Sequence, residues 1–279
     1  MTIYEILIYF FIYGFLGWSV EVAFEAVRKK QFINRGFLNG PICPIYGVGV
    51  TLVILLLERY RDNVLLLFVA SVVLVTLLEG VTGFVLEKVF HNKWWDYSKR
   101  PLNIGGYVCL LFSLIWGLAC VLIVKYIHEI IEKGVHYIPR LTGNVMLIIL
   151  GIIFCIDLLI TAIKVTKMNK HLAYMEDIAN ELHNISDDIG EGVFEGVSGA
   201  MHLVAKTKEK WGGKTGNIEK HILELQKKYK EALERHEHDS KRLMKAFPNM
   251  ISRHYKQALA DTREHIKMAR QNKSNKTGV

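Results

Sequence analysis

Four acidic residues lie within stretches of the sequence that are otherwise apolar. Glu21 and Glu25 are four residues apart, a spacing that places both on one face of a helix, whereas Glu79 and Asp157 lie in two later stretches. A charged side chain at the centre of a bilayer costs at least ~2.5–3.5 kcal/mol, so such residues face a protein interior or water and commonly bind ions or substrates. The four acids predict an acidic cavity for a proton, a cation or a small solute.

Each of these acids also has a structural interpretation, as a protonated or hydrogen-bonded group inside a packed bundle. Glu25 is the weakest candidate, because an acid near the end of a helix can extend toward the interface. Glu79 and Asp157 lie on the order of 10 Å from the same end of their helices, and Glu21 lies slightly closer to that end. This common depth favours one shared cavity over separate structural roles.

Two segments between apolar stretches combine Gly and Pro with large apolar side chains. Residues 34–47 contain glycines and prolines that prevent a regular helix, yet they are too apolar for a solvent-exposed linker. Irregular backbone at membrane depth is tolerated only where protein or a cavity surrounds it, so we expect this loop to be buried or re-entrant. Together with residues 94–106, it contributes the further candidate site residues Arg35, Asn39, Tyr46, Asp96, Arg100 and Asn103.

The two segments resemble each other. Arg35 precedes Leu38-Asn39-Gly40 in the first, and Arg100 precedes Leu102-Asn103 in the second, at an offset of about 64–66 residues. Each also follows an apolar stretch that contains a Glu. The pattern predicts a parallel duplication of a helix–loop–helix unit, with both loops on one side of the membrane. Loops on opposite faces would contradict it.

The elements that must position these residues are apolar helices, because backbone polar groups in lipid have to be hydrogen-bonded internally. A helix needs about 20 apolar residues to cross the hydrocarbon core. We predict an all-α polytopic membrane helix bundle, a transmembrane domain over residues 1–166. Its spans, about five in number and the second of them short, cover residues 3–27, 45–57, 64–86, 104–126 and 145–165.

Basic residues are distributed unequally between the two sides of such a bundle. The first and third loops and the start of the tail carry 11 Lys and Arg residues, and the second and fourth loops carry 5. Cytoplasmic loops are enriched in Lys and Arg. We therefore expect the N-terminus outside, the tail in the cytoplasm, and the protein in the plasma membrane.

Residues 167–279 form a charged helical tail. They contain 21 Lys and Arg and 16 Asp and Glu residues, a net charge of +5. Helical spacing of apolar residues begins at Leu172, and two further helices are predicted over 217–246 and 250–271. The charge suits anionic lipid headgroups beside the bilayer, whereas no nucleic-acid-binding motif is present.

The sequence indicates no cofactor and no metal centre. The four cysteines form no C-x-x-C pair, and three of them lie in apolar stretches. His236 and His238 are two residues apart, so they point to different sides of a helix. Gly212-Gly213-Lys214-Thr215 lacks the first glycine of a phosphate-binding loop.

Long blocks of sequence resemble a known family. Over about residues 5–130 the chain is similar to bacterial membrane proteins labelled as ABC-transporter permeases of the CmpB type. The resemblance implies a multi-pass membrane protein of unestablished activity; two of the blocks are also similar to a small eukaryotic transmembrane family of unknown role. The matching blocks are Asn34-Arg35-Gly36-Phe37-Leu38-Asn39-Gly40-Pro41, Cys43-Pro44-Ile45-Tyr46-Gly47, Glu79 with Thr82-Gly83, Trp95-Asp96-Tyr97-Ser98, and Asn103 with Gly106-Tyr107, Cys109, Phe112-Ser113 and Trp116-Gly117.

Three functions are consistent with these residues. The first is a permease or transport protein, alone, as a homo-oligomer or with a partner subunit, in which Glu21 and Glu79 bind the ion or solute. The second is a non-catalytic scaffold or sensor that acts through its tail. The third is a membrane-embedded enzyme acting on lipid headgroups, with Asp96, Glu79 or Glu21 as the base and with Arg35 and Arg100 binding phosphate. No nucleophile–base pair is recognisable, so we favour a protein that is not an enzyme.

Overall fold

The computed structural model describes residues 1–199, 220–234 and 241–277. These residues form two compact units. The first unit contains Met1–Val165 and a later segment, Arg242–Arg253. The second contains Thr166–Lys241 and His254–Val279. The segment Arg242–Arg253, which the sequence analysis assigned to the tail, thus packs with the apolar helices, and we call it the return segment.

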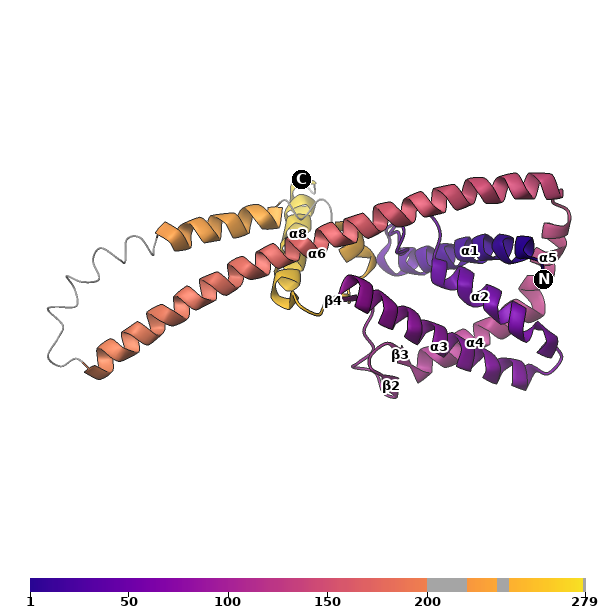
Figure 1. The fold of residues 1–279 in the computed structure, drawn as a ribbon, viewed down its shortest axis with the longest axis horizontal. Helices are drawn as coiled ribbons and strands as arrows, with labels where there is room; N and C mark the ends of the chain where they lie inside the picture. Colours follow the sequence, from indigo (N-terminus) through magenta and orange to yellow (C-terminus); the bar gives the residue numbers. More distant parts are fainter. Residues whose placement is uncertain (200–219, 235–240, 278–279) are drawn as a thin grey trace. The chain divides into compact units, whose positions relative to one another are not determined.

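The first unit is an all-α membrane helix bundle, as predicted (Figure 1). Among the described residues, four helices are long and apolar enough to cross a membrane: α1, α3, the continuous run Leu110–His136, and the Arg140–Ile185 part of α6. The elements of this unit are α1 (Ile3–Lys29), α2 (Pro44–Leu57), η1 (Glu58–Tyr60), α3 (Val64–Phe90), α4 (Leu110–Leu122), η2 (Ile123–Ile127), α5 (His128–His136) and the first part of α6 (Arg140–Gly199).

The predicted second span differs from the structure. The helix α2 has 14 residues, which corresponds to a length of about 21 Å, against roughly 30 Å for the hydrocarbon core. Four helices rather than five therefore meet the length requirement. The predicted fourth span also begins later, at Leu110, because residues 103–109 form a short hairpin instead of a helix.

Local sequence explains where these helices begin and end. Thr2 and Glu5 form a capping box at the start of α1, and Asn63 caps the start of α3 through the backbone N–H of Leu66. Both helices have 27 residues, and both end at a residue in the left-handed region, Lys30 (φ 52°) and His91 (φ 57°). Basic residues in the last turns oppose the negative end of each helix dipole.

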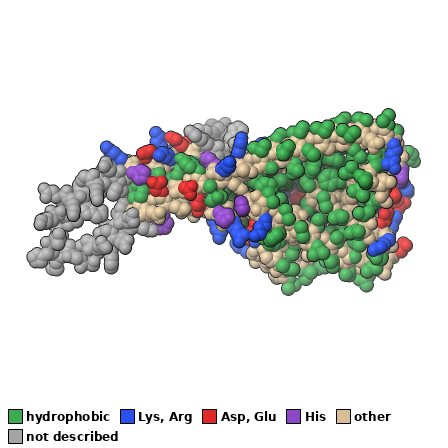
Figure 2. Space-filling view, in the orientation of Figure 1, with side chains coloured by type: hydrophobic (Ala, Val, Ile, Leu, Met, Phe, Trp, Pro, Cys, Tyr) green, Lys and Arg blue, Asp and Glu red, His purple; other side chains and the backbone are tan. Residues whose placement is uncertain are grey.

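The bundle is only partly filled by its own side chains. A core cluster joins α1, α2, η2 and α5 through residues such as Ile8, Ile54, Val124 and Val135. In contrast, only 6% of the most apolar window of α6 and 11% of that of α3 are buried within the protein. The visible face of these helices is covered by hydrophobic side chains (Figure 2). Such a surface is stable only against lipid or another apolar partner.

Glycines allow α1 and α2 to approach closely. A Cβ atom at Gly47 would lie 2.5 Å from the backbone oxygen of Phe10, and one at Gly17 would overlap the ring of Tyr46. The backbone N–H of Cys43 also donates to the oxygen of Gly14 at 2.9 Å. The loop after α1 is thereby held against the helix that precedes it.

The two loops that contain the candidate residues lie at the same end of the bundle (Figure 1). This agrees with the predicted parallel repeat, which opposite placement would have contradicted. The first loop has buried Ile33, Leu38 and Cys43, in agreement with the prediction of a buried segment. The second contains a hairpin of β2 (Asn103–Ile104) and β3 (Val108–Cys109), whose turn uses Gly105 and Gly106 at positive φ.

The return segment contacts both loops. Its strand β4 (Ile251–Ser252) pairs antiparallel with β1 (Asn92–Lys93), which directly follows α3. Phe247 lies edge-to-face on Trp94, with ring centroids 5.0 Å apart. Arg253 lies 3.6 Å from the carboxylate of Glu87. These contacts bring residues more than 150 positions apart in the sequence to one end of the bundle.

The second unit contains the remainder of α6, a helix over 220–234 and α8 (Lys256–Thr277). Its core includes Leu172, Met175, Leu225 and Leu259. α8 begins six residues after the predicted start at residue 250, since a turn and β4 intervene. Gly212-Gly213-Lys214-Thr215 and His236-Glu237-His238 lie outside the described residues.

The contact between α1 and α2 predicts the effect of a single methyl group. Gly47→Ala should lower the thermal stability of the purified protein by the equivalent of about 1–3 kcal/mol, because the opposing atom is backbone and cannot move aside. Gly151 lies in α6, where an added Cβ atom would have no neighbour within 4 Å, so Gly151→Ala should leave the melting temperature unchanged or raise it. Equal melting temperatures for the two variants would contradict this packing.

Candidate functional site

Asp157 of α6 holds the first loop by three hydrogen bonds to its Asn-Gly step. Its Oδ1 accepts from the backbone N–H of Asn39 at 3.1 Å and from the Asn39 amide at 2.7 Å, and its Oδ2 accepts from the backbone N–H of Gly40 at 2.7 Å. Thr161 and Lys164, on the next turns of α6, also bond the Asn39 side chain at 3.0 and 3.1 Å. The carboxylate therefore replaces the backbone partners that an irregular segment lacks.

Arg242 of the return segment holds the same loop at its carbonyl groups. Its guanidinium donates to the backbone oxygens of Gly36, Phe37 and Leu38 at 3.1, 2.9 and 2.9 Å. Burial lowers the pKa of Arg242, against the attraction of the Asp157 carboxylate. Arg remains charged despite that shift, so a buried cation caps three otherwise unpaired peptide oxygens.

Glu21 lies in a polar cluster at the loop end of the bundle. Its Oε1 accepts a hydrogen bond from the Tyr46 hydroxyl at 2.6 Å, and its Oε2 lies 3.5 Å from Nε of Arg35. The three residues come from α1, the first loop and α2, and all three were predicted as site residues. The ring of Tyr46 in turn contacts Trp116 of α4, with centroids 5.2 Å apart.

Glu79 lies in a second cluster, centred on the other loop. Its Oε1 accepts a hydrogen bond from the Tyr97 hydroxyl at 3.2 Å, and the Tyr97 ring stacks on Phe112 of α4 at 5.0 Å. Burial raises the pKa of Tyr97, and the carboxylates of Glu79 and Glu21 raise it further. The Tyr97 hydroxyl therefore stays protonated and donates to Glu79.

The remaining predicted residues have other surroundings. Glu25 is buried and pairs with Arg28 at 2.8 Å and Lys29 at 2.6 Å, which neutralises it within its own helix. Asp96 accepts from the backbone and hydroxyl of Ser98, within a turn.

Two more predicted residues belong to the second loop without contacting an acid of the bundle. Asn103 bonds the backbone of its own loop, through the oxygen of Arg100 at 2.7 Å and the N–H of Gly106 at 3.2 Å. The side chain of Arg100 is exposed. Asn39 and Asn103, matched in the predicted repeat, therefore have different partners.

The sequence analysis missed two residues that contact the candidate site. Tyr97 was quoted only as part of a family motif, although a Tyr beside a predicted membrane acid is a common hydrogen-bond donor. Arg242 lies 85 positions after Asp157, and no local pattern connected the two. Only the fold brings Arg242 and Asp157 to the same loop.

A comparison with known families agrees with this arrangement. The profile of the family described as Putative ABC-transporter type IV matches residues 8–162, which is more than half of the chain. The chain belongs to this family. The region matched to Putative ABC-transporter type IV contains both loops and Glu21, Glu79 and Asp157, and it ends before the return segment. No curated protein and no solved structure matches the chain.

The hydrogen bonds of Asp157 predict a measurable change in the loop. Asp157→Asn replaces an acceptor by an NH₂ group, so the N–H groups of Asn39 and Gly40 can no longer all be bonded. Charge-assisted bonds contribute about 1.5–3 kcal/mol each, and amide exchange in residues 36–40 should accelerate about tenfold or more. Hydrogen–deuterium exchange of the full chain in detergent checks this, with Asp62→Asn, at an exposed loop acid, as the control. Equal amide exchange of residues 36–40 in both variants would contradict the stabilisation of this loop by Asp157.

Proposed function

We propose that this protein is a permease that moves a proton or a small cation across the plasma membrane, with Glu21 and Glu79 as its binding groups. The N-terminus lies outside in this proposal, and both loops and the tail face the cytoplasm. The family description supports a transport role in general terms. The carboxylates of Glu21 and Glu79 are the groups that would bind the proton or the cation.

The observation that carries the proposal is that Glu79 has a neutral hydrogen-bond partner and, in the described part of the chain, no ion pair. Its hydrogen-bond partner is a neutral phenol, and among the residues that the structure describes no Lys or Arg lies within ion-pair distance of it. Glu25, by comparison, has two cationic partners. A carboxylate without a fixed counter-ion in an apolar bundle attracts a proton or a mobile cation.

The arrangement of Glu21 complements that of Glu79. Glu21 has a basic neighbour, Arg35, at 3.5 Å, and this distance leaves the pair looser than the 2.6–2.8 Å pairs of Glu25. Arg35 belongs to the loop that Asp157 and Arg242 hold. We propose that displacement of Arg35 by an incoming cation allows ions to move between Glu21 and Glu79.

The decisive test is flux through proteoliposomes that contain the purified chain. Proton movement is followed with an enclosed pH-sensitive dye under a K⁺ diffusion potential, and cation movement with labelled Rb⁺. Glu79→Gln should reduce flux to the level of empty liposomes, because a neutral amide takes up no proton and attracts a cation far less than a carboxylate does. Glu129→Gln, at an exposed acid on α5, should conduct as the unmodified chain does.

Two outcomes would overturn the proposal. One is unchanged flux in Glu79→Gln at equal reconstitution. The other is the absence of both proton and Rb⁺ flux in the unmodified chain.

The return segment favours the scaffold or sensor as a second candidate. This part of the tail sequence contacts both loops through Arg242, Phe247 and β4. If the protein is a scaffold, a deletion strain should be complemented by a Glu21→Gln/Glu79→Gln variant and not by an Arg242→Ala/Phe247→Ala variant. If the protein is the proposed permease, the Glu21→Gln/Glu79→Gln variant should fail to complement the strain.

A further inference from the structure

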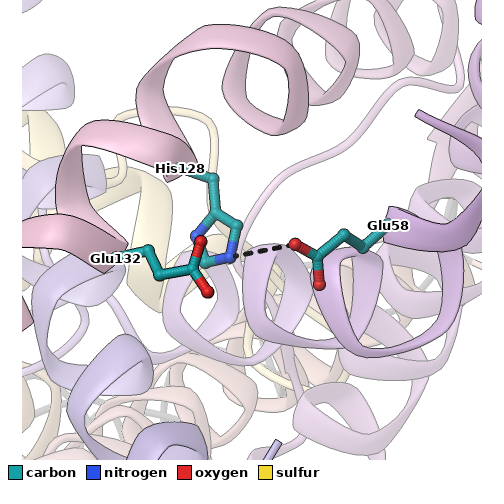
Figure 3. Close-up of side chains that lie close together, drawn as sticks. All are labelled: Glu58, His128 and Glu132. Carbon is teal, nitrogen blue, oxygen red and sulfur yellow. Dashed lines mark ion pairs between the residues drawn. The ribbon is translucent and has the colours of Figure 1, made fainter. Parts of the chain in front are cut away.

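A third polar cluster, distinct from those of Glu21 and Glu79, lies at the end of the bundle opposite the two loops. Glu58 begins η1, His128 begins α5, and Glu132 follows one helical turn later. One ligand atom from each residue lies within 4.8 Å of the others, and Nε2 of His128 is 3.8 Å from Oε1 of Glu58. The imidazole edge points between the two carboxylates (Figure 3). Ligand atoms around one small divalent ion are roughly 3–4 Å apart, so a modest movement of the exposed carboxylates would complete a site.

The helix is irregular at the point where His128 enters this cluster. Residues Ile123–Ile127 form a π-helical turn, and the backbone N–H of His128 donates to the oxygen of Ile123, five residues earlier. An inserted residue rotates the following side chains by about 100° relative to a regular α-helix. Such turns are rare and frequently occur at functional sites. Directly after this turn, the side chains of His128 and Glu132 face α1 and η1.

His128 is held as metal-bound histidines are usually held. It is 3% exposed, its Nδ1 lies 2.9 Å from the Tyr13 hydroxyl, and Tyr9 lies edge-on at 4.9 Å. When Nδ1–H donates to the Tyr13 oxygen, the lone pair of Nε2 faces the two carboxylates. A hydrogen bond on the distal nitrogen fixes the tautomer and orientation of a metal-ligating His.

The carboxylates are accessible and are not neutralised by the nearest strong bases. The side chains of Glu58 and Glu132 are 41% and 43% exposed. Arg61 and Lys133 both pair with Glu129, at 2.6 and 2.8 Å. His136 lies 4.0 Å from Glu132 and is largely exposed. Two carboxylates and a neutral imidazole carry a charge of −2, which one divalent cation balances.

We propose that Glu58, His128 and Glu132 bind a divalent transition-metal ion of the Zn²⁺ or Mn²⁺ class. Imidazole and carboxylate ligands together suit these ions, and three protein ligands leave a position open for water or another group. The site is independent of Glu21 and Glu79. It was not expected from the sequence, since its ligands come from two segments about 70 positions apart and form no spaced motif.

The experiment measures Zn²⁺ binding to the chelator-stripped full chain in detergent by calorimetry. One ion per chain is expected. Glu132→Gln should weaken binding about 100-fold or more, because it removes one of three ligands, whereas Asp62→Asn, at an exposed acid close to Glu58 in the sequence, should bind as the unmodified chain does. Both side chains are accessible, and equal elution volumes confirm that both variants are folded.

Two further variants separate a built site from surface binding. Tyr13→Phe keeps all three ligands and removes only the hydrogen bond to Nδ1, so it should weaken Zn²⁺ binding by about 10–100-fold. His136→Ala should have no effect. Failure of the unmodified chain to bind Zn²⁺ or Mn²⁺, equal binding by Glu132→Gln and Asp62→Asn, or loss of binding in His136→Ala would each overturn the proposal.

Discussion

The loop between α1 and α2 depends on side chains that replace its missing backbone hydrogen bonds. Buried peptide groups without partners cost free energy, and lipid offers none. Asp157 accepts from the N–H groups of Asn39 and Gly40, and Arg242 donates to the carbonyl groups of residues 36–38. The negative side chain thus bonds backbone N–H groups, and the positive side chain bonds backbone carbonyl oxygens. Because Arg35 belongs to this loop, the position of the nearest base to Glu21 rests on the same bonds.

The acids of the bundle differ in their hydrogen-bond and ion-pair partners. Glu25 is enclosed by two cations of its own helix, and Asp157 is saturated by N–H donors. Both are explained as structural groups. Glu79 has a single phenolic donor at 3.2 Å, which stabilises it far less. The sequence already ranked Glu25 lowest as a candidate, but it did not separate Asp157 from Glu79, which differ in their hydrogen bonds.

The sequence predicted the helical bundle because span length and apolar composition are local properties. It also predicted that Glu21, Arg35 and Tyr46 belong to a site, and these three residues do lie together. The bond between Asn39 and Asp157 joins residues 118 positions apart, and no periodicity encodes such a pair. The π turn before His128 was equally hidden, because it follows from packing rather than from local preference.

The single hydrogen bond of Glu79, from Tyr97, also raises the question of why an acid is present at this position. A charged group at membrane depth costs at least ~2.5–3.5 kcal/mol, and one hydrogen bond to a phenol returns only part of that amount. A glutamine would keep a hydrogen bond to Tyr97 without this cost, so stability alone disfavours the acid. Strain or unfavourable charge that persists in a fold is commonly associated with function. Under the proposed permease function, a mobile proton or cation accounts for the acid at position 79, which the packing of α3 does not require.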